Sequence, residues 1–528
     1  MRAVPVRCVF ALCATVLSLL ALPAMAAATS SQSEVDAAIA EAVEYVRGQQ
    51  DPVTGEPFGF EHGSFSSDWV ATSLAAAGVS AADVREAGNP SLQDFLFADY
   101  GSEFWTGGEA GTFTTVANYE RATLVAHAAG LDPARLAAGA NLPAQIAERW
   151  NPAGPGFGEP GTTNTVFGIL ALKVAGVPAW ALSPVVAYLR QSQHDDGGWT
   201  YSGATTGAAK AEASEPDMTG AAIAALCEAG APPYDPPVAA ALAYLQGLLV
   251  DGTGAVHYAF GDNSDATAWA VSGLSACGVD PQSPDWTTPS GKTPIDHLLS
   301  LQVPSGPEAG GFGYQDTSEA NLYSTQDALR AVAGGVFTAN PPLRSDPALP
   351  STRPGASVPA GTAVPHLLAI GSAPGNVRMC KVTAAAGAPL PQVLAAAQAG
   401  GRPAGCVTSF DVAGGRITTL NGVEAANADE AWLLRLDRGP EAVAGEQPVG
   451  FGDVISLRLG EPRNAGGSVE PGGTGGPAGP AGAPGPRGKR GARGRPGRNA
   501  HIACRAHGRK RSGKARVRCN VGKGRRRG

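Results

Sequence analysis

Residues 188–199 read YLRQSQHDDGGW, and residues 214–230 read SEPDMTGAAIAALCEAG. The first stretch ends an amphipathic helix in Arg and Gln and closes on a glycine-rich turn with a tryptophan. The second is a helix of small residues that Asp217 or Thr219 can cap and that Gly230 ends. Neither helix can bury its apolar face alone. Copies of this unit must therefore stack side by side to share a core.

The unit recurs six times between Glu34 and Phe337. The glycines that end the second helices are separated by 52, 46, 54, 48 and 56 residues, at Gly78, Gly130, Gly176, Gly230, Gly278 and Gly334. The second helices are expected at 67–77, 118–129, 163–175, 217–229, 265–277 and 323–333. They are rich in alanine, whereas the first helices, such as 35–49, 184–193, 238–249 and 293–302, are larger and more amphipathic. This difference predicts small helices inside and larger helices outside.

The turns between the helices place a glycine beside an aromatic residue, which allows a tight turn while the ring packs across the repeat boundary. They lie at 56–60, 110–113, 155–158, 196–199 and 310–314. With Gln193 or Gln302 before them, these turns resemble the Gln/Trp repeats of the squalene and terpenoid cyclases and of protein prenyltransferase β subunits. The resemblance implies a mainly α domain at 27–337 in which six helical hairpins close into an α6/α6 toroid.

The chain begins with features of a secretory signal peptide at residues 1–26. Arg2 and Arg7 precede an apolar run at 8–22, and an Ala-x-Ala cleavage site follows at 24–26. No later stretch is long and apolar enough to span a bilayer. We therefore expect a secreted or extracellular protein.

The net charge of −7 hides two oppositely charged parts. All 46 acidic residues precede Pro471, whereas 17 of the 39 Lys and Arg residues follow it and two lie in the signal peptide. The body is thus strongly acidic and the tail strongly basic. An exported basic tail favours anionic cell-envelope polymers as a partner over nucleic acid, in a salt-sensitive interaction.

A proline-rich linker at 338–364 leads to a second pattern at 365–460, where strand signals replace helical ones. A strand is expected at 376–383, a helix at 391–400, a hairpin of 406–412 with 416–420, and strands at 431–436 and 453–459. This small α+β domain, with Leu420-Asn-Gly422 and Trp432, resembles the C-terminal domain of transcobalamin and intrinsic factor. Those proteins also join an α/α toroid to such a domain, in this order.

The remaining chain is a linker with a collagen-like repeat at 461–499 and a basic tail at 500–528. Glycine occupies every third position from Gly473. So few triplets favour an extended spacer, with a weak homotrimer as the alternative. The tail is expected to be a basic hairpin or a disordered arm.

Six cysteines remain after signal removal, and they fall in neighbouring twos. Outside the cytosol this arrangement favours disulfides over metal ligation, and no Cys-x-x-Cys zinc spacing is present. The expected disulfides are Cys227–Cys277, Cys380–Cys406 and Cys504–Cys519.

A hydroxyl residue stands eleven positions before each terminal glycine: Ser67, Tyr119, Thr165, Thr219, Thr267 and Tyr323. In the simpler interpretation these hydroxyls satisfy unpaired amides in the first turn of each inner helix. In the other, six helix starts converge on a polar rim whose positive dipole ends suit an anionic or carbonyl-rich ligand.

One stretch is close to a catalytic motif of the class II cyclases, Asp-x-Asp-Asp followed by Thr. Residues 263–267 read NSDAT, so Asp265 takes the place of the proton donor. Asn263 and Ala266 replace the flanking carboxylates that keep such an acid protonated, and helix capping is therefore the favoured explanation. Together with Asp251 and Asp262, Asp265 also leaves a calcium site open as an alternative.

Three functions follow as hypotheses. The first is an exported, non-catalytic binding protein that holds a small ligand between the toroid rim and the α+β domain, with cobalamin or a related corrinoid implied by the resemblance. Its expected ligand-binding residues are Tyr119, Thr219, Thr267, Trp269 and Tyr323 on the rim, with Trp432 opposite. The second is a cyclase-like enzyme with Asp265 as acid. The third is a structural surface protein that binds a protein partner.

Overall fold

The computed structural model describes residues 29–60, 67–106, 115–151, 156–158, 161–203, 207–373, 375–425 and 430–462, and the strands at 502–507 and 516–521. The signal peptide and the collagen-like repeat lie outside these residues. The chain forms two compact units, Met1–Ser468 and Val469–Gly528. Among the described residues, no helix combines the length and the apolar character needed to cross a bilayer.

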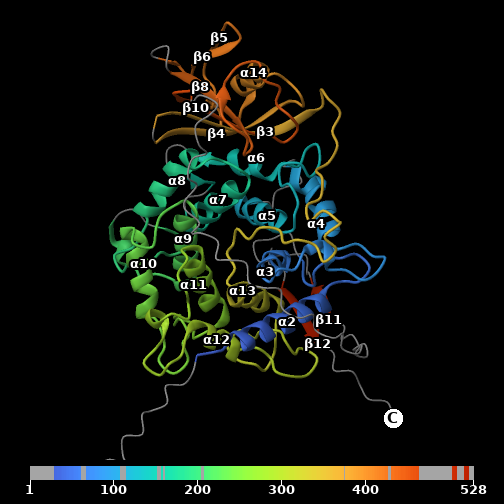
Figure 1. Cartoon of the computed structure of the whole chain (residues 1–528), viewed down its shortest axis with the longest axis vertical. Helices are drawn as coiled ribbons and strands as arrows, with labels where there is room; N and C mark the ends of the chain where they lie inside the picture. Colours follow the sequence, from blue (N-terminus) through green and yellow to red (C-terminus); the bar gives the residue numbers. More distant parts are fainter. Residues whose placement is uncertain are drawn as a thin grey trace, which may run out of the picture. The chain divides into compact units, whose positions relative to one another are not determined.

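Each predicted second helix is present. The helices are α3 (Val70–Ala76, preceded by the 3-10 turn η2, Ser67–Trp69), α5 (Val116–Ala128), α7 (Thr162–Val174), α9 (Pro216–Glu228), α11 (Ser264–Ala276) and α13 (Leu322–Val332). Each helix packs against the next one along the chain, and α13 packs against α3. The sequence of contacts therefore returns to its starting point, and Figure 1 shows these helices inside a layer of others.

The outer layer alternates with these helices along the chain. It consists of α2 (Gln32–Gln49), α4 (Leu92–Tyr100), α6 (Leu142–Ala147), α8 (Ala179–Gln191), α10 (Pro236–Gly247) and α12 (Pro294–Ser300). The predicted start of α8 at Pro184 is wrong, because the helix begins at Ala179 and buries Ala181 and Leu182 against the inner layer. Pro184 lies within the helix instead of at its first position.

Small residues bring α9 and α11 together more closely than ordinary side chains allow. A Cβ atom on Gly220 would collide with the backbone of Trp269, and a Cβ atom on Gly273 would collide with the backbone of Gly220. Nearer the ends of the two helices, Cys227 and Cys277 form the predicted disulfide with a Cα–Cα distance of 5.2 Å. This helix pair is therefore fixed both by packing and by a covalent bond.

The α+β part is built on a five-stranded sheet with the order β4-β3-β10-β8-β9. Its strands are β3 (Ala363–Ala373), β4 (Asn376–Ala385), β8 (Ala431–Leu436), β9 (Ala442–Val443) and β10 (Val454–Gly460). Strands β3 and β10 are parallel, and the other neighbours are antiparallel. One face of the sheet packs on α6 and α8, as Figure 1 also shows.

The other face of the sheet forms a second core with helix α14 (Leu390–Gly400). A smaller sheet of β5 (Phe410–Ala413), β6 (Arg416–Leu420) and β7 (Val423–Glu424) contributes residues to the same core. The predicted disulfide between Cys380 and Cys406 lies in it, with a Cα–Cα distance of 6.0 Å. The predicted helix and hairpin are thus confirmed, although the first hairpin strand begins at Phe410.

The segment predicted as a linker is held along the helical part of the molecule. Between 338 and 362 it forms no helix or strand. Its Arg353 backbone N–H donates to the Gly130 carbonyl at 2.8 Å, and the Ala356 N–H donates to the Arg135 carbonyl at 2.7 Å. The Arg344 guanidinium pairs with Asp83 at 3.2 Å. These contacts tie the segment to residues that follow α3 and α5.

Polar contacts also join the helices to the sheet. The Arg135 guanidinium, in the connection after α5, pairs with Asp437 and Asp453, each at 2.7 Å. The Asn141 side chain donates to the Pro365 carbonyl at 3.0 Å. The Arg438 guanidinium donates to the Val174 carbonyl, at the end of α7, at 2.8 Å. The sheet is therefore docked through specific hydrogen bonds as well as apolar packing.

The basic tail contains two described strands, β11 (Ile502–His507) and β12 (Arg516–Val521). They pair antiparallel, with Cys504 directly opposite Cys519. This pairing agrees with the basic-hairpin expectation, and the Cys504–Cys519 disulfide stays a prediction.

Candidate functional site

Three inner helices hold the preceding glycine-rich turn through a threonine hydroxyl. The hydroxyl of Thr219 accepts from the backbone N–H of Trp199 at 3.0 Å, and that of Thr267 accepts from Val256 at 3.2 Å. In the last repeat, Thr325 accepts from Phe312 at 2.8 Å. These threonines are buried, and their hydroxyls fasten a turn to a helix. Both expected rim residues, Thr219 and Thr267, have this structural role.

Tyr323 is not equivalent to Thr219 and Thr267. Helix α13 has 11 residues, whereas α9 and α11 have 13 each, so counting back from the terminal glycine reaches a position two residues too early. The position equivalent to Thr219 is occupied by Thr325. Tyr323 itself is 40% exposed, and its hydroxyl donates to the Gly59 carbonyl at 3.5 Å.

Tyr119 lies in the interior. Its side chain is fully buried, packs edge to face on Trp105 with ring centroids 5.9 Å apart, and has the Arg149 guanidinium 4.7 Å above its ring. It belongs to the packing between α5 and the outer layer. Its side chain is therefore not exposed, unlike that of Tyr323.

Three carboxyl groups from consecutive inner helices face one another at that end. Asp217 and Asp265 lie in the first turns of α9 and α11, and Asp327 lies on α13. Burial and the negative charge of Asp327 raise the pKa of Asp265 to about 6, against opposing hydrogen bonds from Ser264 and Ser324. Burial likewise raises the pKa of Asp217. We call these three residues the carboxyl group cluster.

Fixed donors hold two members of this cluster. The Trp269 indole N–H donates to Asp327 at 2.9 Å, and the buried Arg330 guanidinium pairs with Asp327 at 2.7 Å. The Tyr201 hydroxyl donates to Asp217 at 3.1 Å. Trp269, an expected ligand-binding residue, thus lies beside Asp265 and Asp327. Asp217 and Asp327, from the helices on either side of α11, thus act electrostatically on Asp265.

Exposed aromatic side chains surround the carboxyl group cluster. The Tyr201 hydroxyl donates to Asp217, and Tyr258 packs edge to face on Phe260. The backbone carbonyl of Tyr314 accepts from the Ser264 N–H, next to Asp265, at 2.8 Å. Their exposed fractions are 41% for Tyr201, 40% for Tyr314 and 74% for Phe260. Together with Tyr323 and the carboxyl group cluster, these residues form what we call the acidic mouth: Tyr201, Asp217, Tyr258, Phe260, Asp265, Tyr314, Tyr323 and Asp327.

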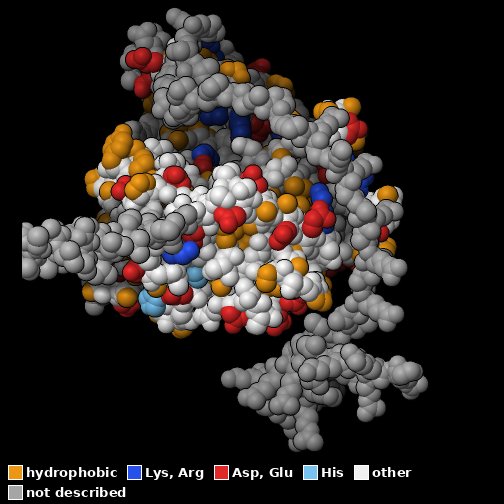
Figure 2. Space-filling view, turned by 60° about the horizontal axis from the view of Figure 1, so that its bottom comes forward, with side chains coloured by type: hydrophobic (Ala, Val, Ile, Leu, Met, Phe, Trp, Pro, Cys, Tyr) orange, Lys and Arg blue, Asp and Glu red, His pale blue; other side chains and the backbone are white. Residues whose placement is uncertain are grey.

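The acidic mouth is negatively charged, although helix starts alone would make it positive. Backbone dipoles make the start of a helix positive, but Asp217 and Asp265 stand in the first turns and compensate for that charge. Figure 2 shows that acidic side chains outnumber Lys and Arg on the face it displays. The mouth therefore suits cationic groups or hydrogen-bond donors better than the anionic or carbonyl-rich ligand of the second interpretation.

Four aromatic side chains of the helical part pack against one another. Trp69, Phe167, Trp269 and Phe337 pack on one another at angles from 58° to 89°, with ring centroids 5.4–6.2 Å apart. The Arg330 guanidinium lies 4.4 Å from the Phe337 ring. Because Trp269 also bonds to Asp327, this aromatic group forms the floor of the acidic mouth.

Trp432 lies apart from the rim residues. It belongs to the core that the sheet forms with α14, and its indole N–H donates to the Val423 carbonyl at 3.3 Å. Side chains alternate along a strand, so Trp432 and Leu434 occupy the face opposite the one that packs on α6 and α8. The structure does not bring Trp432 together with Thr219, Thr267 or Trp269.

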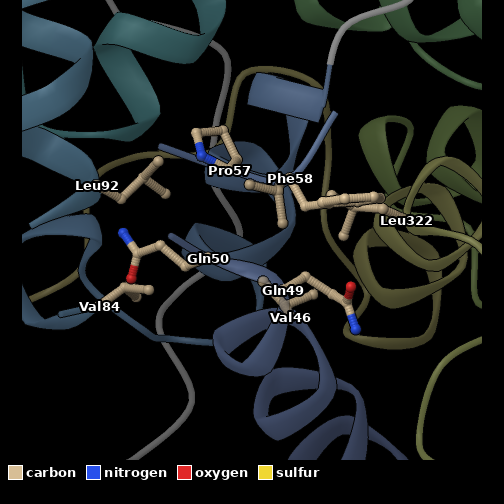
Figure 3. Close-up of a pocket in the computed structure, with 9 residues that line it drawn as sticks. Val46, Gln49, Gln50, Pro57, Phe58, Val84, Leu92 and Leu322 are labelled. Carbon is tan, nitrogen blue, oxygen red and sulfur yellow. The ribbon is translucent and has the colours of Figure 1, made fainter. Parts of the chain in front are cut away.

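An apolar pocket lies in the first repeat. Figure 3 shows its lining residues, which come from the end of α2, the following turn, α3, α4 and the start of α13: Val46, Gln49, Gln50, Pro57, Phe58, Val70, Val84, Leu92 and Leu322. One of its lining residues, Leu322, directly precedes Tyr323 of the acidic mouth in the sequence. Apart from two glutamines, it offers apolar contact only.

The calcium alternative is wrong for the described residues. No group of three or more His, Cys, Asp or Glu residues is arranged there to hold a metal ion. Asp251 accepts instead from the Ser290 N–H at 2.9 Å, and Asp262 pairs with His257 at 2.8 Å. Asp251 and Asp262 are thus each committed to a local turn, whereas Asp265 belongs to the carboxyl group cluster, and the three do not converge.

No family model and no curated protein matches the chain. The solved structures that share some similarity with the chain include haptocorrin in complex with Cbi, at 13% identity and a TM-score of 0.32, covering 81% of this chain and 97% of that one. Type II terpene cyclase MstE from Scytonema has 18% identity and a TM-score of 0.36, covering 58% and 98%. ent-Copalyl diphosphate synthase from Streptomyces platensis has 20% identity and a TM-score of 0.34, covering 51% of this chain and 49% of that one. With TM-scores below 0.5, these similarities do not support a functional assignment.

Proposed function

We propose that the helical part is an α/α toroid of six helix pairs and that the exported protein uses it to bind a small molecule without catalysis. The contacts from α3 round to α13 and back to α3 support the toroid. The signal peptide expected at residues 1–26 and the two disulfides support export, because disulfides persist in oxidising compartments.

The ligand-binding surface that we propose is the acidic mouth. The observation that carries this proposal is the juxtaposition of the carboxyl group cluster with exposed aromatic rings, in particular Tyr201, Phe260 and Tyr314. Carboxylates attract cations and hydrogen-bond donors, and aromatic faces attract cations through their quadrupoles. An organic cation, such as a quaternary ammonium compound, satisfies both.

A corrinoid held between the rim and the α+β domain is the other form of this proposal. The resemblance of the sequence to transcobalamin and intrinsic factor favours it. Haptocorrin, whose solved structure contains Cbi, is compatible with this form of the proposal. The position of Trp432 on the far face of the sheet speaks against that cleft. The acidic mouth is therefore the preferred site for either ligand class.

Titration calorimetry of the secreted protein with choline tests the preferred form. We expect choline to bind about tenfold more tightly at pH 7.5 than at pH 5, because ionised Asp265 adds an attraction that the protonated group lacks. Asp265→Asn should remove this pH dependence, and the exposed control Asp316→Asn should keep it. Binding of cobalamin without choline binding would favour the corrinoid form. Absence of binding by either ligand would overturn the proposal.

A cyclase-like reaction is the second candidate, and the raised pKa of Asp265 favours it. A carboxyl group that keeps its proton near neutral pH can donate it to an alkene, as an acid of the cyclase type does. Against it, the rings of Trp69, Phe167 and Phe337 pack on one another and on Trp269 beside Asp327. Incubation with squalene and with geranylgeranyl compounds, followed by product analysis, tests it: turnover lost in Asp265→Asn would replace the binding proposal.

A structural surface role for the tail can accompany either candidate. The excess of 17 Lys and Arg residues after Pro471 supports retention on anionic envelope polymers. We expect cell-bound protein to be released by 0.5–1 M salt, as screening at that ionic strength reduces the Debye length to about 3 Å. Deletion of 471–528 should give a freely secreted protein and should abolish any trimer. Retention without the tail would contradict this role.

A further inference from the structure

A second pocket lies in the α+β part, far along the chain from the acidic mouth. It opens to solvent. Its lining comes from the adjoining ends of β3 and β4, from the turn between β6 and β7 with the start of β7, and from β8: Ile370, Ser372, Asn376, Arg378, Asn421, Val423 and Trp432. The pocket is thus built from three segments that are distant in sequence.

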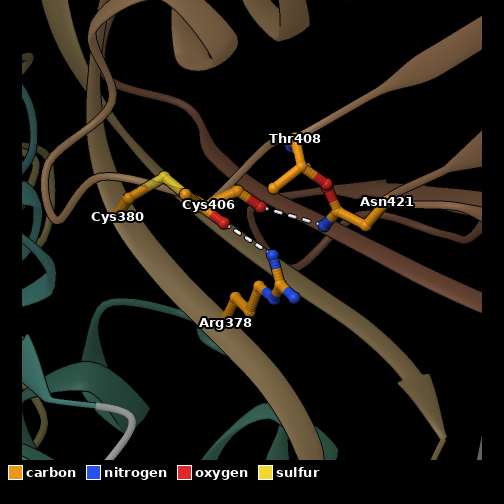
Figure 4. The surroundings of a disulfide bond; sticks show 6 residues. Arg378, Cys380, Cys406, Thr408 and Asn421 are labelled. Atoms are coloured by element: carbon orange, nitrogen blue, oxygen red, sulfur yellow. Dashed lines mark hydrogen bonds between the residues drawn. A yellow bond between two sulfur atoms is a disulfide. The ribbon is translucent and has the colours of Figure 1, made fainter.

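The charged group of this pocket is Arg378, which is fixed by its surroundings. One guanidinium nitrogen donates to the Gly405 carbonyl at 2.6 Å, and the next residue, Cys406, is bonded to Cys380 on the same strand as Arg378. Figure 4 shows the guanidinium beside this disulfide. Among the described residues, no carboxylate forms an ion pair with Arg378. By contrast, Arg135, Arg344 and Arg458 each pair with a carboxylate. Its remaining N–H groups are available to a ligand.

Asn421 is also held in place beside Arg378. Its backbone adopts a left-handed conformation, with φ of 53°. The side-chain oxygen accepts from the Thr408 N–H at 2.7 Å, and the amide nitrogen donates to the Cys406 carbonyl at 2.9 Å, as Figure 4 shows. The disulfide and Asn421 therefore make a rigid wall, so little conformational freedom has to be lost when a ligand binds.

The remaining lining combines one hydroxyl with an apolar base. The Asn376 amide donates to the Ser372 hydroxyl at 2.9 Å, which leaves the hydroxyl hydrogen of Ser372 able to donate into the pocket. Ile370 and Trp432 are buried beneath the polar groups. No Asp or Glu is among the lining residues. The pocket thus offers a cation and a hydroxyl donor above an apolar base.

We propose that this pocket binds a small organic acid through its carboxylate. The Arg378 guanidinium engages the carboxylate with its free N–H groups, because a planar fork of donors matches the two carboxylate oxygens. The Ser372 hydroxyl donates to the same group, and the apolar part of the acid packs towards Ile370 and Val423. This site is independent of the acidic mouth, whose charge selects the opposite kind of ligand.

Titration calorimetry of the secreted, disulfide-intact protein with benzoate tests the site, with benzamide as the uncharged analogue of the same shape. We expect benzoate to bind at least tenfold more tightly than benzamide. Arg378→Gln should reduce benzoate affinity at least tenfold, and Arg378→Lys should reduce it by a smaller factor because the charge remains and the fork is lost. Arg416→Gln, on an exposed strand of the same domain, should leave the affinity unchanged.

Equal affinities for benzoate and benzamide, or an unchanged affinity in Arg378→Gln, would overturn the proposal. Thiol counting under denaturing conditions verifies that each variant keeps the Cys380–Cys406 bond, so that a misfolded variant is not mistaken for a loss of binding. Asp265→Asn should leave benzoate binding intact, and Arg378→Gln should leave choline binding intact. Failure of one site is therefore distinguishable from failure of the other.

Discussion

The hydroxyl of Thr219 accepts a hydrogen bond from the backbone N–H of Trp199 at 3.0 Å and donates to the Glu215 carbonyl at 2.7 Å. One side chain thus joins the glycine-rich turn to the first turn of α9. The indole of Trp199 is fully buried, and its N–H donates to the Leu189 carbonyl at 2.8 Å. The two residues connect an outer helix to an inner helix within one repeat.

Replacement of Thr219 by Val should weaken this connection without changing the side-chain volume. The Trp199 N–H would be buried without an acceptor, which costs about 1–3 kcal/mol of unfolding free energy. Urea denaturation monitored by tryptophan fluorescence measures this loss. Thr418→Val, whose hydroxyl lies at the surface, is the control and should change stability by less than about 0.5 kcal/mol. A loss no larger than that of the control would contradict the structural role of Thr219.

Asp265→Asn should stabilise the protein at neutral pH and have no such effect in acid. The pKa of Asp265 is about 6 in the folded protein and near 3.8 in an unfolded chain. The folded state therefore holds its proton more tightly, and stability falls as pH rises from about 4 to 6, by about 2–3 kcal/mol in total. Asn carries no charge and avoids this loss. Urea denaturation at pH 4.5 and pH 7.5 measures the difference.

Asp316→Asn provides a control of opposite sign. Hydrogen bonds from Ser318 lower the pKa of Asp316, so this exposed carboxylate stabilises the fold above its unfolded-state pKa and loses that effect in acid. The substitution should slightly destabilise the protein at pH 7.5. If Asp265→Asn also destabilised the protein at pH 7.5, the electrostatic description of the carboxyl group cluster would be incorrect.

Removal of the Cys227–Cys277 disulfide, by Ala at both positions, should lower the unfolding free energy by about 4 kcal/mol. The sequence separation of 50 residues makes the closed loop long, and the entropy that a cross-link removes from the unfolded chain grows with loop length. Denaturation of the double variant and the parent protein, without reductant, measures the effect. Close packing at Gly220 and Gly273 should keep the helices together, so binding at the acidic mouth should survive. An unchanged unfolding midpoint would refute this prediction.

Arg135→Gln should loosen the docking of the sheet on the helices. Asp437 and Asp453 would lose their shared cation, at a cost of about 2–3 kcal/mol for the charged hydrogen bonds. Limited proteolysis between 338 and 362 measures this effect, and cleavage should be faster in the variant. Arg458→Gln, which breaks the pair with Glu441 within the α+β part, is the matched control and should leave the cleavage rate unchanged. Equal rates in both variants would contradict a docking role for Arg135.

The missed strand β3 shows where reading the pattern along the chain fails. Residues from Val364 to Ile370 are all buried, because β3 lies between two strands and has a core on each face. Such a strand lacks the alternation that identified 376–383. The linker predicted at 338–364 therefore includes the start of β3. Tyr323 was misaligned for a related reason, since the shorter α13 changes the count within a repeat.

The carboxyl group cluster could not be found from the sequence. Asp217, Asp265 and Asp327 are separated by 48 and 62 residues, and no local spacing relates Asp327 to the other two. Asp327 is on the second turn of its helix, whereas Asp217 and Asp265 are on the first. Their approach depends on how α9, α11 and α13 pack, as does the raised pKa of Asp265.

Local chemistry was enough to specify the repeats, their glycine-bounded helices and two disulfides, because helix ends, turns and apolar periodicity depend on neighbouring residues. Tertiary packing decided which side chains share a surface. Because of this packing, Trp432 lies in the core with α14, and aromatic rings contact one another among the inner helices. The exposed end of α9, α11 and α13 is negatively charged for the same reason. Charge and burial at a point in space are sums over residues distant in the chain, and only the folded arrangement determines them.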